Sequence, residues 1–152
     1  MDLFHATHRE LKVGEIIEPG NWGKKILEIG LTHPSWYREI ILEAVRLFSY
    51  PVKPSRLNCT FSCDSFDTIK RYKQHNCPEG YIYKVIVLNP SLPTHKGDFN
   101  AVEPTPGSGL NMFQIANLYW QFGYKTSVDT WPGIECSEIL SASALQIIEI
   151  IP

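Results

Sequence analysis

The sequence contains no long hydrophobic run, no block of like charges and no large excess of either sign. Its 152 residues carry 14 basic and 16 acidic side chains, for a net charge of −2. Proteins that bind nucleic acid mainly by neutralising phosphates usually carry a basic excess, so this class is disfavoured. No stretch approaches the ~20 apolar residues of a membrane span, and residues 1–5 lack the features of a signal peptide. We therefore expect a cytoplasmic protein that does not span a membrane.

Cysteine is also scarce. The chain has four cysteines: Cys59, Cys63, Cys77 and Cys136. Without a leader sequence, these residues are expected to be reduced thiols rather than a disulfide framework. Two ligand pairs for zinc, Cys59 with Cys63 and His75 with Cys77, are the alternative. Zinc knuckles are usually tight polar turns, whereas 59–63 is typical of a strand, so we expect buried thiols and no metal.

The common signatures of nucleotide and hydrolase chemistry are missing as well. The sequence has no Gly-rich phosphate loop followed by Lys-Ser/Thr, and no G-x-G-x-x-G, H-E-x-x-H or G-x-S-x-G motif. Asp64 and Asp67 follow a predicted strand and are alternatives as metal-binding carboxylates. Capping of the next helix and interaction with its dipole are the favoured interpretation.

The composition, 43% hydrophobic and 12% aromatic, indicates one folded domain over residues 1–152. Apolar periodicity predicts strands at 3–7, 59–63, 81–88, 138–140 and 145–151. It predicts helices at 35–48, 65–72 and 112–122. Residues 13–23 and 89–107 are rich in Gly or Pro and are predicted to be turns and loop. Because helices and strands alternate without a βαβ rhythm, we expect an α+β fold with largely antiparallel sheets.

In the helix predicted at 35–48, apolar residues recur at three- and four-residue steps, and charged residues occupy the other side. The apolar residues are Tyr37, Ile40, Ile41, Ala44, Val45 and Phe48, and the charged residues are Arg38, Glu39, Glu43 and Arg46. We expect the apolar residues to face the core. The charged residues are expected to form mainly a solvated face with pairing between successive turns.

Three short motifs, remote in sequence, occur in the order of a known superfamily. Phe4-His5-Ala6-Thr7 is similar to an H-x-[ST] opening strand, and Phe61-Ser62-Cys63-Asp64 is followed eight residues later by Tyr72. Glu138 opens a strand that precedes an apolar last strand. The chain thus resembles the ADP-ribosyltransferase superfamily in its His-Tyr-Glu branch, which includes diphtheria toxin and the poly(ADP-ribose) polymerases. Residues 53–58 add a resemblance to an uncharacterised bacterial domain family.

The resemblance implies two packed, mostly antiparallel sheets around an NAD cleft, and a mono-ADP-ribosyltransferase activity with NAD as the substrate. In that activity Glu138 is the expected catalytic carboxylate, because cleavage of the nicotinamide–ribose bond passes through an oxocarbenium-like state. Tyr72 and Phe61 are expected to stack on the nicotinamide ring. The branch usually has Tyr at the position of Phe61, which keeps the flat ring face but lacks the hydroxyl.

The remaining binding residues implied by the resemblance lie on the first strand and before the third. The backbone at His5 and Ala6 is expected to hold the carboxamide of nicotinamide. The His5 side chain and Thr7 are expected to bind the adenosine ribose. Arg56 is the expected partner of the pyrophosphate, with Arg9 as a weaker second candidate.

The sequence leaves several features of this activity open. The acceptor is a protein, a nucleic acid or a small molecule, and analogy suggests a bacterial toxin, effector or phage-defence protein with a cognate inhibitor or immunity protein. An NAD glycohydrolase and a catalytically silent NAD- or ADP-ribose-binding module are the alternatives. Glu135 is an alternative carboxylate to Glu138. The segment 104–109 is expected to be a linker, with a lid as the alternative.

Overall fold

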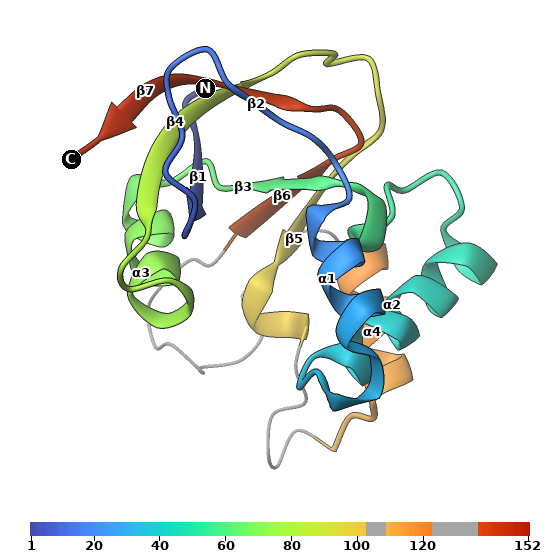
Figure 1. The fold of residues 1–152 in the computed structure, drawn as a ribbon. Helices are drawn as coiled ribbons and strands as arrows, with labels where there is room; N and C mark the ends of the chain where they lie inside the picture. The colour runs from blue at the N-terminus through green and yellow to red at the C-terminus, as the bar shows by residue number, and fades with distance from the viewer. Residues whose placement is uncertain (103–108, 123–136) are drawn as a thin grey trace.

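The fold was determined as a computed structural model, which describes residues 1–102, 109–122 and 137–152. Within these ranges the strands form two sheets, and every strand pairing is antiparallel (Figure 1). The four-stranded sheet has the order β1 (Leu3–Thr7), β4 (Tyr81–Val87), β7 (Leu145–Ile151), β2 (Ile16–Ile17). The three-stranded sheet has the order β3 (Thr60–Ser62), β6 (Ser137–Ser141), β5 (Thr94–Asp98). The prediction of an α+β fold with antiparallel sheets is confirmed.

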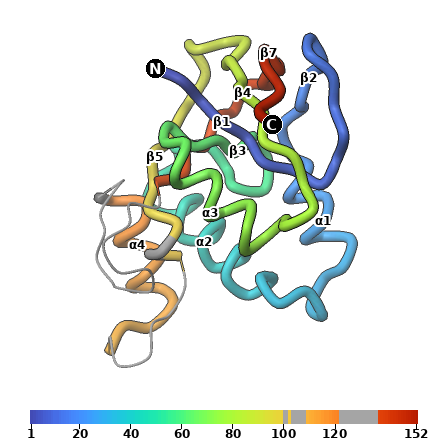
Figure 2. The backbone as a smooth tube through the Cα atoms, turned by 90° about the vertical axis from the view of Figure 1, so that its left-hand side faces the viewer, coloured from blue at the N-terminus to red at the C-terminus, as the bar shows by residue number. Residues whose placement is uncertain are grey.

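Four helices flank the sheets within the described ranges. They are α1 (Asn21–Ile29), α2 (Trp36–Ser49), α3 (Phe66–Asn76) and α4 (Met112–Phe122). Short 3-10 helices lie at Gly30–Thr32, Arg56–Asn58 and Phe99–Val102. Helix α3 lies on one side of the three-stranded sheet, and α1, α2 and α4 lie on the other (Figures 1 and 2). None of the helices in these ranges has the length and apolar composition needed to cross a bilayer.

The two sheets touch where the first strand passes the third. An isolated antiparallel bridge joins Phe4 to Cys63, with both N···O distances at 2.8 Å. One residue further along β1, His5 contacts the backbone carbonyl of Phe61. These contacts bring the first strand of one sheet beside the third strand of the chain, so residues far apart in sequence become neighbours.

Several predicted elements have the expected bounds because their local signals agree with their burial. Helix α4 occupies 112–122, and the strands at 3–7 and 145–151 also match. Helix α3 begins as predicted, because the Ser65 hydroxyl caps it by accepting a hydrogen bond from the Thr68 N–H at 3.3 Å. The helix continues four residues beyond its predicted end at residue 72.

Two predictions of irregular structure are wrong. Residues 89–107 were predicted to be loop, yet 94–98 form β5 and 99–102 form a 3-10 helix. The sequence of β5, Thr-His-Lys-Gly-Asp, has low strand propensity, and its pairing with β6 supplies the order instead. Residues 13–23, predicted to be turns, contain β2 and the start of α1.

The face of α2 that meets the core also differs from the prediction. Tyr37 and Phe48 are 67% and 91% exposed, although both belong to the predicted apolar stripe. Glu39 is fully buried and Arg46 is 9% exposed, although both belong to the predicted solvated face. The buried face of α2 therefore includes part of its charged side. Buried charges require partners. Arg46 pairs with Glu43, and the partners of Glu39 belong to the site described below.

The apolar core consists of separate clusters. The cluster between α2, α4 and the three-stranded sheet contains Leu42, Val45, Cys59, Val102, Ala116, Tyr119, Trp120 and Leu140. A second cluster lies on the four-stranded sheet and contains Leu11, Ile17, Tyr83, Val85, Leu145 and Ile147. A third contains Cys63, Ile69 and Ile82. Cys59, Cys63 and Cys77 are buried thiols, as predicted, whereas Cys136 lies outside the described residues.

Close packing of α1 on the 3-10 helix at 56–58 yields a prediction for Gly23. A Cβ atom at this position would lie 1.9 Å from the carbonyl oxygen of Leu57. Alanine normally favours a helix over glycine, but here we expect Gly23→Ala to lower the free energy of unfolding by about 1–3 kcal/mol through overpacking. Urea denaturation measures the change, with Lys24→Ala on the exposed side of α1 as the control. Equal midpoints for both variants would contradict this close packing.

Candidate functional site

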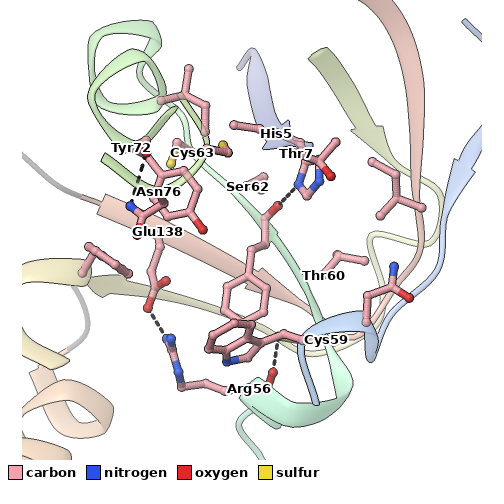
Figure 3. A pocket seen from close by; sticks show the side chains of 18 of the residues that line it. His5, Thr7, Arg56, Cys59, Thr60, Ser62, Cys63, Tyr72, Asn76 and Glu138 are labelled. Carbon is pink, nitrogen blue, oxygen red and sulfur yellow. Dashed lines mark hydrogen bonds and ion pairs between the residues drawn. The ribbon is translucent and has the colours of Figure 1, made fainter. Parts of the chain in front are cut away.

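A cavity of about 960 Å³ opens between β1, β3, α1 and α3 (Figure 3). This volume lies within the range of about 300–1,000 Å³ that is typical of small-molecule sites. All the candidate site residues lie on its wall: His5, Ala6, Thr7, Arg56, Phe61, Tyr72 and Glu138. The fold therefore brings together residues from the beginning, middle and end of the chain.

Glu138 reaches the cavity from the start of β6, where it lies opposite Gly97 of β5. Its carboxylate is almost completely buried. Oε1 accepts a hydrogen bond from the Tyr119 hydroxyl at 2.7 Å and forms an ion pair with Arg56. A Cβ atom on Gly97 would lie 2.4 Å from Cε2 of Tyr119, so the tyrosine ring packs directly over this glycine. The absence of a side chain at residue 97 thus allows Tyr119 to reach Glu138.

Arg56 connects Glu138 to a second buried carboxylate. Its Nε and Nη2 donate to the two oxygens of Glu39 at 2.9 and 3.2 Å, and its Nη1 donates to the Tyr119 hydroxyl at 2.8 Å and to Glu138. Arg56 is only 2% exposed, and its guanidinium lies 5.2 Å from the centre of the Phe61 ring. The donors predicted to meet a pyrophosphate are thus already engaged, and this geometry gives Arg56 a positioning role toward Glu138 instead.

The charges of this cluster stabilise one another. Burial alone would lower the pKa of Arg56, but the attraction of Glu138 and Glu39 outweighs it and raises the pKa well above its usual value. Burial alone would raise the pKa of Glu39, but Arg56 and Arg38 lower it below the usual value. The cluster therefore keeps Glu39 ionised and Arg56 charged despite their removal from water.

His5 lies across the cavity from Glu138 and Tyr72 (Figure 3). Its Nδ1 lies 2.8 Å from the carbonyl oxygen of Phe61, and because a carbonyl only accepts, Nδ1 carries the proton. Burial lowers the pKa of His5, although the bond to Phe61 opposes this, and the charge of Arg9 lowers the pKa further. The imidazole is therefore neutral near pH 7, and Nε2 presents a lone pair that can accept a hydrogen bond.

Tyr72 projects from α3 onto the same side of the cavity as Glu138 (Figure 3). Its ring meets Phe99 edge to face, with 5.7 Å between the ring centres. Burial raises the pKa of Tyr72 to about 12, so its hydroxyl is protonated under ordinary conditions. Tyr72 can therefore contribute an aromatic surface and a neutral hydroxyl to the cavity.

Sequence analysis missed the two residues that complete the cluster around Arg56. Glu39 was placed on a solvated face, because its charge gives no sign of a buried arginine from another element. Tyr119 lies on α4, for which the sequence predicted a helix at 112–122 but no site residue. A tyrosine within an apolar surface usually needs a hydrogen-bond partner for its hydroxyl, and this is the signal that sequence analysis overlooked.

The other polar candidates have structural partners or lie beyond the described ranges. Asp64 accepts hydrogen bonds from Ser137 at 2.8 Å and Lys96 at 2.6 Å, which ties the start of α3 to β5 and β6. Within the described ranges, no group of three or more His, Cys, Asp or Glu residues is arranged to hold a metal ion. Glu135, and the segment 104–109 except for Gly109, lie outside these ranges.

The buried cluster yields a prediction for Arg56. Replacing it with methionine leaves Glu39 and Glu138 buried without their cation, so we expect Arg56→Met to lower the free energy of unfolding by about 3–5 kcal/mol. Chemical denaturation at pH 7 measures the loss. Lys84→Met, which removes a surface ion pair with Asp2, is the control and should change stability little. A similar small effect for both variants would contradict the role given to Arg56.

His95 makes stability depend on pH. It is buried beneath Tyr119, whose carbonyl oxygen lies 3.1 Å from its Nε2, and burial together with the nearby Lys53 lowers its pKa to about 4. In the unfolded chain His95 takes up a proton near pH 6.5. In the folded chain it stays neutral until the pH falls to about 4. We therefore expect stability to fall by about 2 kcal/mol between pH 7 and pH 5 through this residue. Urea denaturation across this range should show a shallower dependence for His95→Asn, and equal slopes would contradict the assignment.

Comparison with known proteins gives a family but no characterised relative. No curated protein matches the chain significantly. The family described as "Protein of unknown function (DUF2441)" matches residues 5–151, a span that begins at His5 and includes the whole cavity wall. The chain belongs to the DUF2441 family.

Proposed function

We propose that this protein is an NAD-dependent mono-ADP-ribosyltransferase whose two sheets form an ADP-ribosyltransferase-like core. The observation that carries the proposal is the convergence of His5, Tyr72 and Glu138 on one cavity. These residues are separated by most of the chain, and they are the ones that the resemblance assigns to NAD. Their convergence supports the proposal because a shared cavity is the minimum requirement for a common substrate.

In the proposed reaction, the bond between ribose C1′ and the nicotinamide nitrogen breaks, and its electron pair leaves with neutral nicotinamide. The ribose becomes positively charged, and the carboxylate of Glu138 stabilises this charge. Because Arg56 and Tyr119 both bind Oε1, Oε2 is the oxygen left to face the substrate. An acceptor hydroxyl or amine then attacks C1′ and releases its proton to Glu138 or to water.

The other side chains would orient the dinucleotide. Tyr72 supplies the ring on which nicotinamide stacks, whereas Phe61 already has the Arg56 guanidinium beside its ring and therefore contributes mainly packing. The free Nε2 of His5 accepts a hydrogen bond from a ribose hydroxyl. The backbone at His5 and Ala6 would hold the carboxamide, and Thr7 would support the ribose.

The acceptor and the biological setting follow from analogy with the superfamily alone. We propose a protein, nucleic acid or small molecule as the acceptor, in a bacterial toxin, effector or phage-defence protein opposed by a cognate inhibitor. Transfer to water would make the protein an NAD glycohydrolase, and loss of cleavage would make it a binding module.

Substitution of Glu138 tests the proposed reaction. Glu138→Gln keeps the size of the side chain and removes its charge, so we expect nicotinamide release from NAD to fall by about 10²–10³-fold, with NAD affinity changed little. Chromatography of nicotinamide and calorimetry of NAD binding measure the two effects. Glu149→Gln, an exposed residue on β7, is the control with the same change of charge.

Three results would contradict the proposal in different ways. Equal nicotinamide release by Glu138→Gln and the unsubstituted protein would remove Glu138 from the reaction. Free ADP-ribose with no modified acceptor in a lysate would favour the glycohydrolase. Binding of NAD without any cleavage by the unsubstituted protein would favour a silent module.

A further inference from the structure

A second, basic end of the cavity is formed by Trp22 and Lys25 of α1. Helix α1 lies on the opposite side of β3 from α3 (Figure 1), and both of these residues line the cavity. Arg9, which follows β1, and Arg38 of α2 line it as well, with Glu18 as the acidic residue of this region. Arg38 is already paired with Glu39, so Lys25 and Arg9 are the cations of this set that a ligand could pair with.

This second end matters because Arg56 is already neutralised. The Arg56 guanidinium is bound by two buried carboxylates and is 2% exposed. A ligand with negative charges must therefore find other cations. Burying a phosphate group without a cation would be costly, so the free basic residues of the wall are the groups that such a ligand would meet.

Lys25 supplies the cation of this end of the cavity. Its ammonium lies 5.8 Å from the centre of the Trp22 ring, and no hydrogen bond or ion pair involves this ammonium within the described part of the chain. Trp22 is fixed by an edge contact with His33, with 5.3 Å between the ring centres. The indole N–H of Trp22 is buried and has no acceptor among the described residues. The ammonium of Lys25 thus lies beside an indole that lines the cavity and whose buried N–H donor is unsatisfied among the described residues.

The position of α1 relative to Arg56 and Glu138 is fixed by close backbone contacts. Gly20 adopts φ 91°, and its N–H donates to the carbonyl oxygen of Cys59 at 3.0 Å. Gly23 packs on the backbone of Leu57, next to Arg56. Because the same short segment carries Arg56 and supports α1, the basic end and Glu138 keep a fixed separation.

We propose that Lys25 and Trp22, together with Arg9, bind the diphosphate of a dinucleotide, so that its nicotinamide end lies at Glu138. The inference rests on the proposed function. It assigns cations of this chain to the diphosphate of the substrate, which the already paired Arg56 does not bind. The ammonium of Lys25 would pair with phosphate oxygens, and a small shift of the indole would let Trp22 donate to one of them. The ligand class is a nucleoside diphosphate.

Calorimetric titration with ADP at low salt tests this inference. ADP carries the diphosphate but lacks nicotinamide, so its binding does not depend on cleavage. We expect Lys25→Gln to weaken ADP binding about tenfold, and Trp22→Phe, which keeps a ring but removes the N–H donor, to weaken it about fivefold. Lys24→Gln is the matched control, because Lys24 is the exposed neighbour on α1 and does not line the cavity.

The outcomes separate this inference from the proposed function. Absence of ADP binding, or equal affinities for Lys25→Gln and Lys24→Gln, would overturn the inference, as would ADP binding by Trp22→Phe that equals that of the unsubstituted protein. If any of these three results were found while nicotinamide release still depended on Glu138, the proposed function would stand and only the inference would fail. ADP binding that depends on Lys25 and Trp22 without any NAD cleavage would support the inference and contradict the proposed function.

Discussion

The ion pairing of Arg56 with Glu39 and Glu138 is the interaction on which the site depends. It joins α2, the 3-10 helix at 56–58 and β6, which are otherwise separate parts of the chain. The guanidinium of Arg56 is shared between these two carboxylates, and Glu39 also pairs with Arg38. In the proposed reaction, Glu138 can stabilise a cationic centre because it shares the positive charge of Arg56 with Glu39.

Much of the fold could be predicted from the sequence because its local signals agree with tertiary burial. The alternation of β-branched and aromatic residues in β4 and the serine cap of α3 are examples in which short-range chemistry and long-range packing favour the same structure. Strand β5 could not be predicted, because its order comes from pairing with β6, about forty residues further along the chain. Its sequence contains no periodic apolar pattern.

The candidate site shows a similar division. The positions of His5, Tyr72 and Glu138 on one cavity were anticipated through a resemblance to a superfamily, since each motif alone is too short to carry chemistry. The burial of Glu39 could not be anticipated, because a charged residue on a helix is usually solvated and its partner lies on another element. Arg56 was assigned to a ligand for the same reason: sequence shows that a cation is present, but not which anion it already binds.

The bridge between Phe4 and Cys63 has a mechanical consequence. His5 belongs to the four-stranded sheet, whereas Glu138 and its anchoring arginine are attached to the three-stranded one. The two hydrogen bonds of the bridge therefore tie the sheet that carries the histidine to the sheet that carries the carboxylate. The span across the cavity between His5 and Glu138 is therefore set by backbone hydrogen bonds between the sheets and not by a contact between the two side chains.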